Sequence, residues 1–335
     1  MDGAHVRPSP HNLQVFATLL GALPQPSIEE RVGAGDRTEG LDPVVAAIRA
    51  QETAGLEPIT DGRLRDPSFD LLAASLLRPG GVDEAVTTVL EGWRALAVAT
   101  ERATKQALPG PYSVGLRAGG MERDREARTL AAAEALAEIV AVLAEAGCPL
   151  VEIEEAEAHR LVGAPEQDLF RGAHRRLTEG AASIHRTLSI VGGSVPQAAI
   201  DTVLEAPYAS IAVDLIAGPD NWYLVRRASS DQGVIAGVQS AGKIDEPKEV
   251  MLWGAHYAAS SGGRGSDRVG VGSAGSWANL TWVAALRKLN RLGEVARLAE
   301  MPVSEELLQS LDPRAVSSRR AAVGHGPRPL PGKHR

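Results

Sequence analysis

Residues 130–155 read LAAAEALAEIVAVLAEAGCPLVEIEE, and this stretch decides the fold class that we predict. From Leu130 to Leu143, apolar residues recur every three or four positions, which is the periodicity of a helix. After a Gly-Cys-Pro break, Leu150–Ile153 is a short apolar run typical of a buried strand. A long helical pattern followed at once by such a strand is one unit of an α/β fold.

The same alternation continues on both sides of this unit. Strands that alternate with helices are parallel, and about eight repeats favour a single (β/α)₈ TIM barrel. A doubly wound open sheet remains the alternative. The predicted strands are Leu13–Thr18, Glu57–Thr60, Lys105–Leu108, Leu150–Ile153, Arg186–Val191, Ser210–Asp214, Val234–Val238 and Arg268–Val271, and the last predicted helix runs from Trp277 to Leu298.

The 335 residues suit one barrel with short extensions, because such a barrel takes about 250 residues. We predict an irregular segment at 1–10, the barrel at 11–305 and a C-terminal extension at 306–335. This extension is predicted to be mostly a mobile tail, because its Pro, Gly and Arg residues cannot bury a core. The apolar run Leu13–Leu23 has some character of a signal peptide, but Gln14 and Thr18 interrupt it, and a first barrel strand fits better.

Composition limits the partners of this protein. A net charge of −7 without a basic stripe argues against nucleic acid, and no apolar run reaches the roughly 18 residues of a membrane span. Cys148 is the only cysteine, so an intrachain disulfide is impossible and a reducing, cytoplasmic location is expected. We expect a small-molecule substrate and no nucleic-acid or membrane partner, and a homo-oligomer is compatible with the sequence.

Charged and polar residues follow several of the predicted strands. In a parallel barrel the site forms at the C-terminal ends of the strands. Charges gathered at one rim cost desolvation unless they bind a ligand or pair with each other, so ion pairs that only hold loops remain an alternative. The residues concerned are Asp61, Arg63 and Arg65 after the second strand, Glu154 and Glu155 in the fourth, Asp214 at the end of the sixth, and Gln239 after the seventh.

A glycine-rich loop follows the last predicted strand. Residues 270–275 read GVGSAG, and we expect the backbone N–H groups around Gly272 and Ser273 to approach an anion at the start of the next helix. A tight turn without a ligand remains open. Among the eight histidines no pair has HxH or HExxH spacing, so we predict no metal site.

Four short strings point to a known family. Residues 21–26 read GALPQP, 51–62 QETAGLEPITDG, 109–113 PGPYS and 151–155 VEIEE. In this order they resemble GSFPQT, QExAGLDVxxDGE, PGPYT and IQIDEP of the cobalamin-independent methionine synthase family, which shares a barrel superfamily with uroporphyrinogen decarboxylase. The resemblance implies a (β/α)₈ barrel with its site at the C-terminal rim.

The departures from that family bear on function. The resemblance places Ser189, Val191, Asp214 and Ala274 where the family has its zinc ligands, and one carboxylate is not a zinc site. Without zinc, no group that would activate a thiol for methylation is visible. The positions that hold homocysteine in the family carry Ala22 in place of Ser, Arg63 in place of Glu and Glu154 in place of Asp. The change to Arg63 reverses a charge and favours an anion.

We therefore predict an enzyme without metal or cofactor that acts on a small, carboxylate-bearing anion by acid–base chemistry of the lyase or decarboxylase type. One alternative is a methyl or alkyl transferase, with a folate-type donor and an acceptor other than homocysteine; another is a non-catalytic binding protein. The predicted catalytic residues are Asp61, Glu154 and Asp214, and the predicted substrate-binding residues are Gln25, Arg63, Arg65, Tyr112, Glu155, Trp222, Gln239, Gly272, Ser273 and Trp277.

Overall fold

A curled parallel sheet forms the centre of the protein. The computed structural model describes residues 15–28, 30, 42–180, 184–242 and 245–299, and the predicted segments 1–10 and 306–335 lie outside these ranges. Within them, seven strands pair in the order β1-β7-β6-β5-β4-β3-β2, which confirms the α/β class and the parallel pairing. The strands are β1 (Phe16–Thr18), β2 (Gln106–Pro109), β3 (Leu150–Glu155), β4 (His185–Ile190), β5 (Ser210–Asp214), β6 (Gly233–Ser240) and β7 (Val269–Ala274).

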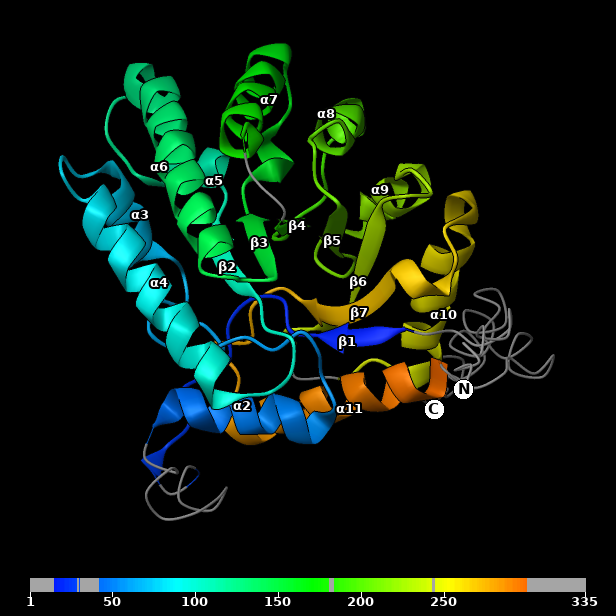
Figure 1. Ribbon diagram of the computed structural model, residues 1–335. Coiled ribbons are helices and arrows are strands. Elements are labelled where there is room, and N and C mark those ends of the chain that lie inside the picture. Colours follow the sequence, from blue (N-terminus) through cyan, green and yellow to red (C-terminus); the bar gives the residue numbers. More distant parts are fainter. Residues whose placement is uncertain (1–14, 29, 31–41, 181–183, 243–244, 300–335) are drawn as a thin grey trace, which may run out of the picture.

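Helices surround this sheet as in a TIM barrel (Figure 1). Helices α3 to α10 lie outside β2 to β6, while α2 and α11 pack together beside β1 and β7. Among the described helices, none combines the length and the apolar character needed to cross a membrane. The helices are α2 (Pro43–Ala54), α3 (Asp70–Leu77), α4 (Val82–Ala99), α5 (Pro111–Arg117), α6 (Arg125–Glu145), α7 (Ala164–Thr178), α8 (Ile200–Leu204), α9 (Trp222–Arg227), α10 (Lys248–Ser260) and α11 (Trp282–Ala299).

The predicted second strand, Glu57–Thr60, is not a regular strand. Ile59 makes only an isolated parallel bridge with Thr104. The Glu57 N–H donates to the carbonyl of Ala17, 2.8 Å away, and the Lys105 N–H donates to the carbonyl of Ile59, 2.9 Å away. Pro58 has no N–H to donate, which interrupts the ladder here. The described sheet therefore has seven strands rather than the eight predicted.

The last helix begins later than predicted. We expected it from Trp277, but α11 starts at Trp282, where Thr281 Oγ1 accepts the N–H of Ala284 at 3.3 Å. The preceding residues are held to the loop after β1, because the Trp277 N–H donates to the carbonyl of Ala22 at 2.7 Å. A helix N-terminus therefore does not directly follow the glycine-rich loop.

Two glycines of that loop serve packing inside the sheet. A side chain on Gly270 would come within 2.6 Å of the Phe16 ring, and one on Gly272 within 3.1 Å of Leu20 Cγ. Leu20 belongs to a small apolar cluster, with Phe16 against it, that is separate from the main core between sheet and helices. Close approach of apolar side chains thus accounts for glycine at both positions.

Alternation along β3 separates its side chains into two groups. Val151 and Ile153 are fully buried in the main core between the sheet and the helices. Glu152 and Glu154 have the opposite parity and point to the other face, where they meet side chains from other barrel segments. Glu155 has the same parity as Val151 and Ile153, so it faces the helices, where its carboxylate contacts His174 of α7.

Candidate active site

A short polar turn after residue 60 positions the first candidate residue. Thr60 Oγ1 accepts the Gly62 N–H at 3.0 Å, and Asp61 Oδ1 accepts the Arg63 N–H at 2.8 Å. Arg63 has a φ of 50°, in the left-handed region that non-glycine residues seldom adopt. The turn directs its side chain inward, so that Arg63 is only 6% exposed.

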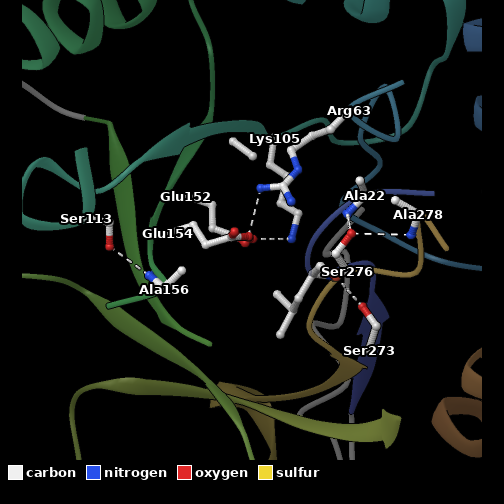
Figure 2. A network of polar contacts seen from close by, with 12 residues as sticks. Ala22, Arg63, Lys105, Ser113, Glu152, Glu154, Ala156, Ser273, Ser276 and Ala278 are labelled. Carbon is white, nitrogen blue, oxygen red and sulfur yellow. Dashed lines mark hydrogen bonds and ion pairs between the residues drawn. The ribbon is translucent and has the colours of Figure 1, made fainter. Parts of the chain in front are cut away.

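The guanidinium of Arg63 links two segments of the rim. Its Nη1 donates to Glu154 Oε2 at 2.9 Å, as Figure 2 shows, and its Cζ lies 4.1 Å from the centroid of the Phe69 ring. Phe69 also has a left-handed φ, 63°. The Nε of Arg63 has no hydrogen-bond partner among the described residues. Asp61, Arg63 and Glu154, which were predicted separately, are thus joined through the arginine.

A second ion pair lies deeper on the same face of β3. Lys105 and Glu152 form this pair (Figure 2), with Lys105 Nζ 2.5 Å from Glu152 Oε2. Each side chain is 1% exposed. Glu152 Oε1 has no partner within the described ranges. Sequence reasoning took Lys105 only as the start of a strand and missed this pair. The signal was available, because Glu152 is two residues before Glu154 and so shares its face of the strand.

A cleft of about 480 Å³ opens beside this network. Asp61, Arg63 and Arg65 line one part of it, and the ring of Phe69 with side chains of α3, α4 and β2 forms the remaining walls. A much smaller cavity, also lined by Phe69, includes Glu154 in its wall. Asp61, Arg63 and Arg65, which were all predicted as site residues, therefore line one cleft. Glu154 is joined to this cleft by its ion pair with Arg63.

Glu155 and Tyr112 lie on the helix side of β3. The two Glu155 oxygens accept the N–H groups of Tyr112 at 3.0 Å and Ser113 at 2.8 Å, so this buried carboxylate caps the start of α5. His174 Nε2 lies 3.0 Å from the same carboxylate. A side chain on Gly110 would come within 2.1 Å of Glu155 Cδ, which explains glycine in the PGPYS string. Burial raises the pKa of the Tyr112 hydroxyl above its ordinary range, and its hydrogen bond to a glutamate on α7 adds to this effect.

Other predicted residues hold loops of the rim. Asp214 Oδ1 accepts the N–H groups of residues 216 and 217 at 2.9 and 2.8 Å. The Gln25 amide donates to the carbonyl of Leu64 at 2.9 Å, and the Gln239 amide donates to a carboxylate of the following loop at 3.2 Å. Ser273 Oγ accepts the N–H of residue 20 and donates to the carbonyl of the same residue. None of these four predicted residues is part of the cleft wall.

The aromatic residues predicted to bind the substrate do not share one site. Trp222 packs between α9 and α10, with its ring centroid 5.0 Å from that of Trp253 and 5.1 Å from that of Tyr257. Trp277 is fully buried in the loop after β7, and its Nε1 has no partner in the described part of the chain. Tyr112 makes its ring contact with a residue of α7. The structure therefore does not bring these rings together.

Comparison with known proteins identifies the fold. No protein-family model and no curated protein matches this sequence. A solved structure of a B12-independent methionine synthase from Shewanella sp. W3-18-1 matches with a TM-score of 0.65 and 16% identity, over 89% of this chain and 99% of that one. The chain has the fold of the B12-independent methionine synthases. A putative vitamin-B12 independent methionine synthase from Listeria monocytogenes (TM-score 0.61, 16% identity, 85% and 98% covered) and a methyltransferase from Methanosarcina mazei (0.56, 15%, 86% and 94%) match as well.

Residue types at the zinc positions of the methionine synthase resemblance do not fit the metal. Ser189 is fully buried, and its hydroxyl has no partner among the residues described. Val191 and Ala274 carry no donor atom, and one oxygen of Asp214 is already bound to backbone N–H groups. Across the described ranges, no three His, Cys, Asp or Glu side chains are grouped so that they could hold a metal ion. A hydroxyl and one carboxylate do not make a zinc site, which is built from thiolates, imidazoles and carboxylates.

Proposed function

We propose that this chain is a metal-independent enzyme that acts on a small carboxylate-bearing anion by acid–base chemistry of the lyase or decarboxylase type. The observation that carries the proposal is the position of Arg63, which contacts Asp61 through its backbone and Glu154 through its side chain while lining a cleft. The matching solved structures are named as enzymes, which supports a catalytic role in the same fold.

The groups around the cleft have complementary tasks in this proposal. Arg65 is exposed, lines the cleft and makes no ion pair with a described residue, so it would bind the substrate carboxylate. Asp61 and Glu154 each keep one carboxylate oxygen that accepts no hydrogen bond from a described residue. In an elimination, one of them would remove a proton from the substrate carbon and the other would protonate the leaving group. In a decarboxylation, one of them would protonate the carbon that loses CO₂. We assign the Asp214 side chain to holding its loop, because both hydrogen bonds of its carboxylate go to that loop.

A closed eight-stranded barrel is part of the same proposal. Residues 57–60 would take the place of the remaining strand, between β1 and β2. Backbone hydrogen bonds from Glu57 to β1 and from Lys105 to Ile59 support this placement.

The test begins with a panel of small carboxylates that raise the melting temperature. Each such compound is incubated with the protein in D₂O, and its C–H signals and products are followed by NMR. Replacing Asp61 by Asn or Glu154 by Gln should slow exchange or turnover by about 10²- to 10⁴-fold, the usual contribution of a general acid or base. Glu91→Gln, an exposed carboxylate on α4, is the matched control and should leave the rate unchanged. Full activity in both carboxylate variants would refute the proposal.

A methyl or alkyl transferase is the second candidate, and the names of the solved structures favour it. In this case the acceptor would not be homocysteine, because no zinc would activate its thiol. A folate-type donor should then raise the melting temperature of the protein. No shift at millimolar folate would count against this candidate and leave the first in place.

A further inference from the structure

Different segments supply the polar and the apolar lining of the cleft. Asp61, Arg63 and Arg65, which we call the polar end, come from the turn that follows residue 60. The apolar wall consists of Leu71 and Leu72 of α3, Ala85 and Val89 of α4, and the Phe69 ring. The cleft has a volume of about 480 Å³, which is within the range of small-molecule sites. Such sites are mostly apolar and contain a few placed polar groups.

Most charges around the cleft are already compensated. Arg63 pairs with Glu154, and Arg78 pairs with Glu84. Asp66 accepts the N–H groups of residues 71 and 72 at 3.3 and 2.9 Å, at the positive end of α3. Arg65 is the cation that makes no ion pair with a described residue. The polar end therefore suits one anionic group rather than several.

Leu71 is unusual because it lines the cleft and is nevertheless 68% exposed. An apolar ligand group lying between α3 and α4 would cover part of this side chain. Burial of apolar surface is favourable and scales with the area removed from water. The wall is thus complementary to a chain or ring and not to a second charged group.

We infer that the ligand of this cleft is an amphipathic anion, with one carboxylate at Arg65 and an apolar chain or ring between α3 and α4. This inference rests on the proposed function and specifies its substrate class. Each buried CH₂ group raises the affinity about fourfold. Octanoate has about four CH₂ groups more than butanoate, so it should bind up to about 200-fold more tightly.

The experiment measures binding of butanoate, octanoate and octylamine to the full chain by isothermal titration calorimetry. We expect octanoate to bind at least about tenfold more tightly than butanoate, and octylamine not to bind, because its charge is opposite. Arg65→Ala should weaken both carboxylates, whereas Leu71→Asp should weaken octanoate and leave butanoate unchanged. Val98→Asp, on α4 and 90% exposed, is the matched control and should change neither.

Three outcomes would overturn the inference, and they differ in what they mean for the proposed function. Equal binding of butanoate and octanoate, both lost in Arg65→Ala, would overturn the inference and leave the proposed function standing. Octanoate binding that survives both Arg65→Ala and Leu71→Asp would overturn the inference by placing the ligand elsewhere. If neither carboxylate binds, the proposed function fails together with the inference.

Discussion

Removing the ammonium group of Lys105 should destabilise the protein strongly. Lys105 and Glu152 are each 1% exposed and lie 2.5 Å apart, and the second oxygen of Glu152 has no partner among the described residues. Replacing Lys105 by Met would leave a carboxylate buried without its counter-ion. Breaking such a buried pair from one side costs about 3–5 kcal/mol of the free energy of unfolding.

The double variant separates charge from packing. With Met at both Lys105 and Glu152, no isolated charge remains, and apolar replacement of a buried ion pair is often close to neutral. We therefore expect the double variant to lose less than about 2 kcal/mol, so the two single changes should not add. The assay is guanidinium denaturation at pH 7.5, followed by tryptophan fluorescence and by far-UV circular dichroism.

An exposed ion pair provides the control. Arg78 and Glu84 are 55% and 63% exposed, so Arg78→Met should cost less than about 1 kcal/mol. If Lys105→Met is no more destabilising than Arg78→Met, the account of the deep pair is wrong. A double variant as unstable as the sum of the single variants would contradict it equally.

Three further predictions concern packing and titration. Gly110→Ala should cost at least about 1–3 kcal/mol of unfolding free energy, because its Cβ would lie 2.1 Å from Glu155 Cδ; an unchanged denaturation midpoint would contradict this. Partial desolvation of their imidazole rings lowers the pKa of His185 and of His256 below 6.5, so the unfolded chain takes up protons first as the pH falls. The contribution of these two histidines to the free energy of unfolding should therefore be fully present above about pH 6.5 and should be lost as the pH falls below it. The difference between the urea midpoints at pH 7.5 and pH 5.5 should be smaller in the doubly substituted His185→Asn, His256→Gln protein than in the unchanged protein. Burial raises the pKa of Cys148 to about 11, so a thiol reagent at pH 8 should react slowly with the folded chain and fast in denaturant; equal rates would refute its burial.

Periodicity in the sequence was sufficient for most of the fold. Seven of the predicted strands overlap seven observed ones, because short apolar runs between helical patterns depend only on local spacing. The exception, Glu57–Thr60, contains a proline, and its partners come from distant parts of the chain. The start of α11 was placed too early for a similar reason, since a hydrogen bond from Trp277 to Ala22 holds the loop.

The candidate site was predictable only in part. Position in or just after the end of a predicted strand was enough to select Asp61, Arg63 and Glu154, which the structure joins through hydrogen bonds. It could not distinguish Glu154 from Glu155, although strand parity places Glu155 with the apolar residues that face the helices. The pairing partner of Lys105 and the cleft wall of α3 and α4 depend on tertiary packing, which no local pattern encodes.

The zinc content of the purified chain tests the central claim most directly. Protein made without a histidine tag is incubated with zinc, dialysed without a chelator and measured by elemental analysis. Because Ser189, Val191 and Ala274 stand at the ligand positions of the resemblance, we predict far less than about one zinc per chain. About one tightly held zinc per chain would contradict the metal-independent account and make methyl transfer the better reading.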